Sequence, residues 1–179
     1  MAKYKKIKKY DVHVLALAAV NADLFDYPLE KNAVIVVTNR ENRFLSEGHI
    51  SNLLTLPFPD YEDKETEGAF NRAHARAIIR FLDELPDTVT DVYVCCSKGG
   101  SRSAAIAAAL LRMSGRSDRD VWQNPYYVPN TLVYYRLCKE FGLFVTEHSV
   151  ARRRKQNEKA FRDAKAGNPC KYERWQIFR

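Results

Sequence analysis

The sequence contains no apolar run that approaches the roughly 20 residues needed to cross a bilayer. Its four cysteines have neither the spacing of a metal site nor that of a disulfide framework, and its four histidines are scattered without ligand spacing. These absences argue against a membrane protein, a metalloenzyme and a disulfide-stapled secreted domain. We therefore expect no metal, no cofactor and no transmembrane segment, and we expect reduced thiols in a cytoplasmic protein.

Hydrophobic residues make up 46% of the 179-residue chain, which suits one packed domain rather than a disordered chain. The lysine-rich start and the apolar residues that follow it imitate a signal peptide. However, residues 21–23 make a poor cleavage site, so we interpret residues 12–18 as a core strand.

Charge is distributed unevenly along the chain, whose formal net charge is +7. Residues 1–10 hold five lysines and no acid, and residues 151–179 hold ten Lys or Arg against three acids. The part between them is acidic. We therefore divide the chain into a domain over residues 1–150 and a basic C-terminal helix or tail over residues 151–179. These basic ends are either solvated or contact an anionic partner, such as nucleic acid or an acidic surface.

Strand and helix patterns alternate along the chain. Runs of apolar or β-branched residues predict strands at 11–18, 33–38, 53–56 and 92–94. Apolar spacing and composition predict helices over 68–85, 104–113, 132–141 and 150–166. The fold class is therefore α/β, with a central, mostly parallel sheet flanked by helices. Ligands in such folds bind at the carboxyl ends of the strands, which is where Cys96 would lie.

The segment between the predicted strand at 92–94 and the helix at 104–113 has the composition of an anion-binding loop. Five residues separate Cys96 from Arg102, and two of them, Gly99 and Gly100, let backbone N–H groups turn inward. The helix that follows adds its positive N-terminal end, and Arg102 supplies a planar fork for two phosphate oxygens. The same field favours a thiolate at Cys96. The pattern predicts a cysteine nucleophile beneath a cradled phosphate.

This loop resembles the signature His-Cys-x2-Gly-x2-Arg-Ser/Thr of the cysteine-based protein tyrosine and dual-specificity phosphatases, especially compact microbial members. Cys96, Gly99, Arg102 and Ser103 match it, and Cys95 stands where the family has a histidine that supports the loop by hydrogen bonding. The order of elements over about residues 33–143 is also similar. The resemblance implies a phosphate loop whose substrate-binding residues are Ser97, Lys98, Gly99, Gly100, Ser101, Arg102 and Ser103.

The leaving group of a phosphoester needs a proton, and the resembled family supplies it from an aspartate on a loop upstream of the cysteine. The string Phe-Pro-Asp that ends at Asp60 is similar to that family's Trp-Pro-Asp loop. We therefore assign Asp60 as the general acid, with Asp63 or Glu62 in reserve. Asn130 would either brace the loop or cap the helix that follows it, and Tyr126 or Tyr127 could line the mouth of the pocket.

The expected activity is hydrolysis of phosphate monoesters through a phosphocysteine intermediate. The expected substrates are phosphorylated proteins, first phosphotyrosine and then phosphoserine or phosphothreonine. One alternative is an RNA 5′-phosphate or another non-protein phosphoester, which would suit the basic ends. Another is a catalytically weak phosphate-binding module, because the thiol of Cys95 is a weak hydrogen-bond donor. Sulfur or arsenate chemistry fits worse, because the related loops have a different length or position.

Overall fold

The computed structural model describes residues 7–19, 29–39 and 50–179, and all structural statements below refer to these residues. Five strands form one sheet in the order β3-β2-β4-β1-β5. Strands β1 (Asp11–Ala16), β2 (Asn32–Thr38), β3 (Leu53–Pro57) and β4 (Asp91–Cys96) run parallel to their neighbours. The short strand β5 (Ile177–Phe178) pairs antiparallel with β1. The sheet is therefore mostly parallel, as its near-continuous apolar strands predict.

The strands differ from the predicted ones only near their ends. All seven residues of β2 are buried, and β4 continues past Val94 through Cys95 and Cys96. Pro57, one residue beyond the predicted strand, is the last residue of β3. This position tolerates a proline because β3 is an edge strand of the sheet, where a missing N–H costs no ladder hydrogen bond.

The helices are α2 (Arg72–Asp83), α3 (Arg102–Met113), α4 (Arg119–Gln123), α5 (Thr131–Glu140) and α6 (Glu147–Lys165), and a 3₁₀ turn, η2 (Leu29–Lys31), precedes β2. Helix α2 begins four residues later than predicted because Asn71 caps it: its side chain accepts hydrogen bonds from the N–H groups of Ala73 and His74. Thr146 and Ser149 form a reciprocal capping box at the start of α6.

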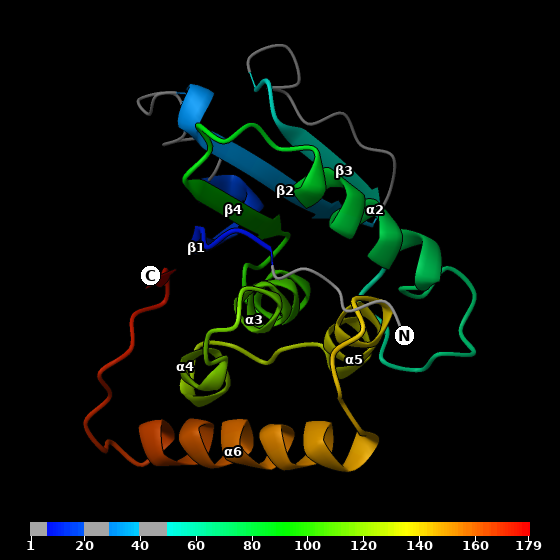
Figure 1. Ribbon diagram of the computed structural model, residues 1–179. Coiled ribbons are helices and arrows are strands. Elements are labelled where there is room, and N and C mark those ends of the chain that lie inside the picture. Colours follow the sequence, from blue (N-terminus) through cyan, green and yellow to red (C-terminus); the bar gives the residue numbers. More distant parts are fainter. Residues whose placement is uncertain (1–6, 20–28, 40–49) are drawn as a thin grey trace.

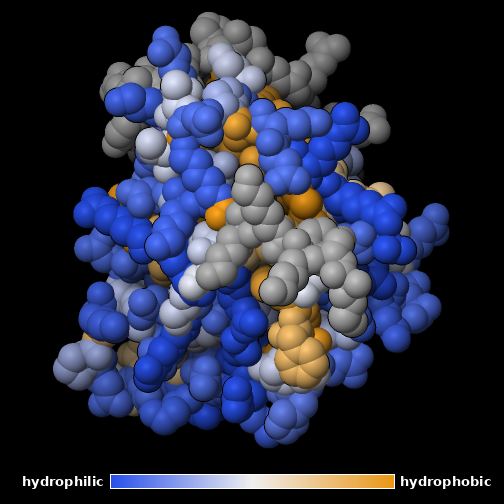
Figure 2. Space-filling view, viewed as in Figure 1, coloured by the Kyte–Doolittle hydropathy of each residue, from blue (hydrophilic) through white to orange (hydrophobic). Residues whose placement is uncertain are grey.

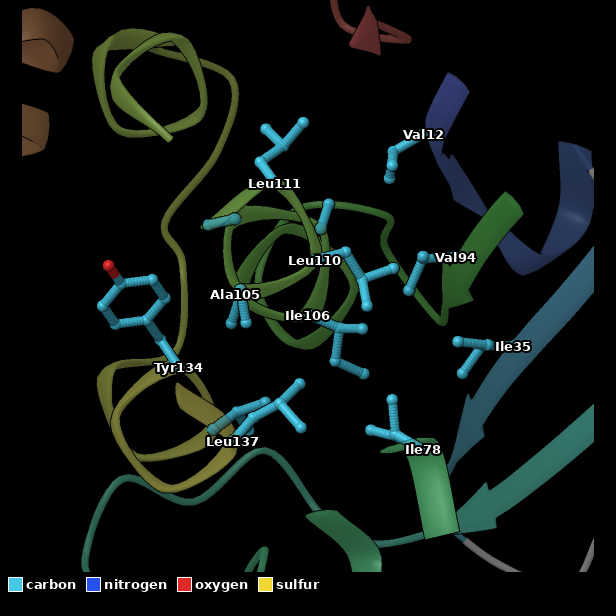
Figure 3. Packing of buried hydrophobic residues seen from close by; sticks show 14 of the residues in the cluster. Val12, Ile35, Ile78, Val94, Ala105, Ile106, Leu110, Leu111, Tyr134 and Leu137 are labelled. Carbon is cyan, nitrogen blue, oxygen red and sulfur yellow. The ribbon is translucent and has the colours of Figure 1, made fainter. Parts of the chain in front are cut away.

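The core lies between the sheet and helices α2 and α3. Val12, Ile35 and Val94 point from three strands toward Ile106 and Leu110 of α3 (Figure 3). Helix α5 packs against α2 and α3, and α6 packs against α4 and α5 as the outermost helix (Figure 1). This arrangement confirms the α/β prediction and places α3, which follows the cysteine segment, directly against β1 and β4.

The division at residue 150 remains a prediction, but the chain after it is built into the described fold. Helix α6 begins at Glu147, and after it the chain returns to add β5 to the edge of the sheet (Figure 1). Neither β5 nor α4 was predicted. Three of the basic side chains of α6 form ion pairs, with Asp118, Glu62 and Asp163. No described helix combines the length and apolar character that a bilayer crossing requires.

Candidate active site

Residues 96–102, called the cysteine loop below, connect the carboxyl end of β4 to the first turn of α3. Gly99 has a φ of +68°, a left-handed conformation that suits glycine. A Cβ atom there would lie 2.4 Å from the backbone nitrogen of Ala16 and 2.6 Å from the ring of Trp175. Glycine at this position therefore lets the loop lie directly on the end of β1.

The Cys96 side chain is buried, with only 2% of the residue exposed, and its Sγ lies 3.2 Å from the Ser103 hydroxyl oxygen. Burial opposes ionisation of this thiol, but four contacts together outweigh it and lower the pKa of Cys96. They are the Ser103 hydroxyl, the Ser103 backbone N–H, the charge of Arg102 and the Gly99 backbone N–H. The loop thus makes the Cys96 thiol more acidic than an ordinary cysteine.

Arg102 is 3% exposed, and its guanidinium is held from three sides. One terminal nitrogen donates to Asn39 Oδ1 at 2.6 Å and to the Phe58 carbonyl at 2.7 Å, and the other donates to Ser97 Oγ at 3.2 Å. Its Nε is buried and finds no hydrogen-bond acceptor among the described residues. An oxyanion in the loop would supply the acceptor that this donor lacks.

Asp60 lies beside the cysteine loop because two side chains hold its carboxylate there. Asp60 Oδ1 accepts from the Ser101 hydroxyl at 2.9 Å and from Asn130 Nδ2 at 2.8 Å. Ser101 is the N-cap residue of α3, yet its hydroxyl makes no capping bond. The hydroxyl instead ties the two loops together, which leaves the start of α3 open to an anion.

Asn130 performs both of the roles considered for it. Its Oδ1 accepts from the Val133 N–H and caps α5, while its Nδ2 donates to Asp60 and to the Tyr61 carbonyl. Glu62, a reserve acid, accepts instead from the Thr131 N–H and contacts Arg154 of α6. Asp63 accepts from the Glu65 N–H. Among the acids considered, Asp60 is the one that bonds to the cysteine loop.

These groups line one cavity of about 460 Å³. Its walls are the whole cysteine loop together with Asn39, Asp60, Tyr126, Val128 and Arg174. All predicted residues from Cys96 to Arg102 therefore lie in it, whereas Ser103 lies beneath, against the sulfur. Tyr126 is exposed at the cavity, but Tyr127 is fully buried in the core, so only the first of these two tyrosines lines the pocket.

Cys95 takes no part in this cavity. It is fully buried in a second apolar cluster with Val34, Val36 and Tyr93, apart from the cluster that holds Cys96. Alternation along β4 explains the separation, because successive side chains of a strand point to opposite faces. Burial raises the pKa of the Cys95 thiol, and the nearby charge of Cys96 raises it further by a smaller amount. Cys95 therefore packs in the sheet rather than supporting the loop.

Sequence reasoning missed three residues of the cavity, Asn39, Val128 and Arg174. Asn39 follows the end of β2, whose carboxyl end lies beside that of β4, and this topological position was a usable signal. Arg174 reaches the cavity only because the chain returns after α6 and adds β5 next to β1. No local pattern in the sequence marks that return.

The contact between Ser103 and Cys96 predicts a measurable change in thiol reactivity. Ser103→Ala should raise the Cys96 pKa, because the hydroxyl bond is the largest contribution that lowers it. The alkylation rate of Cys96 by iodoacetamide should then begin to rise at a higher pH than in the parent. The measurement requires a Cys170→Ser background, because Cys170 is the exposed thiol. Ser97→Ala is the matched control, since Ser97 bonds to Arg102 instead; an equal shift in both variants would contradict the assignment.

Comparison with known proteins finds likenesses among solved structures. No protein-family model matches the chain, and no curated protein matches it. Among solved structures, it is similar to a crystal structure of Tk-PTP in the active form, at 16% sequence identity. The match covers 89% of this chain and 99% of that chain, with a TM-score of 0.41. A likeness this distant carries no argument about activity, so the chemistry must be inferred from the site itself.

Proposed function

We propose that this protein is a phosphatase that hydrolyses phosphate monoesters through a phosphocysteine at Cys96. The observation that carries the proposal is the meeting of three groups in one cavity: Cys96 with a lowered pKa, Arg102 with an Nε donor that has no acceptor among the described residues, and Asp60 tied to the loop by Ser101. Cys96 and Arg102 come from the two ends of the cysteine loop, and Asp60 comes from a separate segment of the chain. The same residue types at the same places are what the resemblance to cysteine-based phosphatases implies.

In the proposed first step, the Cys96 thiolate attacks phosphorus and the ester oxygen leaves with the bonding electrons. Asp60 gives that oxygen its proton, so that an alcohol or phenol departs and a phosphocysteine remains. Arg102 and the loop N–H groups bind the three equatorial oxygens and stabilise the charge that develops on them. The positive start of α3 contributes in the same direction.

In the second step, water attacks the phosphocysteine and Asp60, now ionised, takes a proton from it. The sulfur leaves as a thiolate, and the Ser103 hydroxyl, 3.2 Å from Sγ, donates a hydrogen bond to it. Inorganic phosphate is the product. The cycle consumes one water and regenerates both Cys96 and Asp60 in their starting states.

Aryl esters such as phosphotyrosine are the preferred substrates in this proposal, with phosphoserine and phosphothreonine also included. Two exposed apolar side chains, Tyr126 and Val128, line the cavity and could contact the ring of a bound aryl phosphate.

The decisive experiment is hydrolysis of an aryl phosphate, combined with rapid acid quenching and mass spectrometry of the protein. We expect phosphate release and a phosphoryl group on the peptide that contains Cys96. Orthovanadate binding without any turnover would replace the proposal with a non-catalytic phosphate-binding module, the alternative that the absence of the family histidine at Cys95 keeps open.

The loop that carries Asp60 is fastened to α6 by Arg154, and this contact gives a further prediction. Burial opposes ionisation of Glu62, but the Arg154 and Thr131 hydrogen bonds outweigh it and lower its pKa. Arg154→Ala should lower kcat by about two- to fivefold, in line with a partly exposed ion pair. Arg152→Ala, an exposed neighbour on α6, should leave kcat unchanged.

Thermal unfolding gives the second measurement for this contact. Because the folded pKa of Glu62 lies below its unfolded value, the contact stabilises the protein above pH about 4.5 and is lost as pH falls through the folded pKa. The Tm difference between parent and Arg154→Ala should therefore shrink in acid. A difference that stays constant from pH 7 to pH 3 would contradict the assignment.

A further inference from the structure

Residues 173–178, called the C-terminal segment below, contribute Arg174 to the lining of the cavity and are held in place at several points. Asn124 Nδ2 donates to the Glu173 carbonyl at 2.9 Å, and the Gln176 N–H donates to the Tyr127 hydroxyl at 3.2 Å. The Val14 N–H donates to the Gln176 carbonyl at 3.4 Å, just before β5 pairs with β1. The segment is thus part of the sheet edge.

Two neighbouring side chains of this segment face the cysteine loop. The Trp175 ring lies against Gly99, so close that a Cβ there would be 2.6 Å from it. The Arg174 guanidinium lies 5.1 Å from the centre of the Trp175 ring, and Arg174 lines the cavity that contains Cys96. Stacking on the ring restricts the long arginine side chain and keeps its charge near the loop.

The cavity holds two cationic side chains, Lys98 and Arg174, that the proposed mechanism does not use. Its walls include Arg102, Lys98 and Arg174, against the single carboxylate of Asp60. Lys98 and Arg174 are both exposed, and neither forms an ion pair with a described acid. By contrast, Arg153 and Arg154 of the nearby α6 are each paired with a carboxylate.

We infer that Arg174, together with Lys98, forms a second anion subsite beside the cysteine loop, which takes a second phosphate group of the same substrate molecule. This inference rests on the proposed function, because it takes the first phosphate to lie over Cys96. The favoured substrate class is a small molecule or chain end with two or more neighbouring phosphates.

The shared cavity favours neighbouring phosphates on one molecule over two phosphorylated residues of a peptide. Adjacent side chains of an extended peptide point to opposite sides, so the second phosphate of such a peptide would point away from the loop. The two phosphates can be joined by an anhydride or can stand on neighbouring carbons. Inorganic tripolyphosphate represents the first arrangement and inositol hexakisphosphate the second.

The test measures binding of orthophosphate, tripolyphosphate and inositol hexakisphosphate by calorimetry, in the full chain with Cys96→Ser so that no probe is consumed. We expect at least one of the two polyphosphates to bind about tenfold or more tightly than orthophosphate, as a further charge-assisted contact implies. Adding Arg174→Ala should remove most of this margin, which is the affinity for polyphosphate relative to that for orthophosphate. It should change the affinity for orthophosphate itself less than about twofold, because the first phosphate binds to the loop. Arg152→Ala, with the same loss of charge on α6, should keep the margin.

The outcomes separate the inference from the proposed function. A margin that survives Arg174→Ala, or that is absent in the parent although orthophosphate binds, overturns the second subsite and leaves the phosphatase proposal intact. Failure of orthophosphate to bind at all would instead contradict the phosphate loop. Which polyphosphate shows the larger margin identifies the arrangement of the two phosphates. A peptide with two adjacent phosphotyrosines that binds more tightly than both would overturn the preference for a single small molecule.

Discussion

Cys96→Ser is expected to reduce aryl phosphate hydrolysis by a factor on the order of 10⁴ to 10⁶, as removal of a covalent nucleophile does in other hydrolases. A serine hydroxyl at the same place is a far weaker nucleophile, because no neighbouring base deprotonates it and its pKa lies far above that of a thiol. Phosphate binding should survive, since Arg102 and the loop N–H groups remain. The measurement pairs steady-state hydrolysis with calorimetric binding of orthophosphate.

Cys170→Ser is the matched control for this variant, because Cys170 is exposed and lies outside the cavity. Its activity should equal that of the parent. Hydrolysis by Cys96→Ser at the parental rate would contradict the covalent mechanism and would favour direct attack of water on the phosphoester. Loss of both turnover and phosphate binding would show that serine disrupts the loop, and Cys96→Ala would then be needed to separate the two effects.

Asp60→Asn is expected to lower kcat by about 10²- to 10⁴-fold, the usual contribution of a positioned acid. The amide oxygen can still accept from Ser101 and Asn130, so the loop should keep its place while losing the transferable proton. The loss should be largest for alkyl phosphates and smallest for nitrophenyl phosphate, whose leaving group scarcely needs protonation. Comparing the two substrate classes therefore reports proton transfer rather than general damage.

Asp63→Asn supplies the control for this second variant, because the Asp63 carboxylate accepts a hydrogen bond from the Glu65 N–H and from no other described group. It should retain parental activity on both substrate classes. Parental activity in Asp60→Asn together with reduced activity in Asp63→Asn would assign the role of general acid to Asp63.

Local rules were sufficient to predict much of this fold and most of the candidate site. The parallel strands are continuous apolar runs, and the Cys-x5-Arg spacing by itself predicts an anion-binding turn between β4 and α3. The Asp60 loop was found because its Phe-Pro-Asp string is similar to the Trp-Pro-Asp loop of the resembled family. Each of these signals lies within a few residues of sequence, where backbone preferences and side-chain types act directly.

The features that escaped prediction depend on contacts between distant parts of the chain. Strand β5 has only two residues and exists because β1 offers an open edge. Arg174 enters the cavity through that pairing, and the second hydrogen bond of Asn130 forms because the Asp60 loop folds back onto the start of α5. No periodicity or composition marks such contacts, since they follow from tertiary packing alone.

The position of the C-terminal segment has a consequence for limited proteolysis. Arg174 is exposed, in a stretch between α6 and β5 that is neither helix nor strand, and exposed stretches of this kind are where proteases cut. A trypsin-like cleavage after this arginine would release β5 while sparing Cys96, Arg102 and Asp60. The trimmed protein would keep its nucleophile and its acid but would lose Trp175 and the β5 pairing, which hold Arg174 at the cavity, so its choice of substrate would change before its capacity for chemistry did.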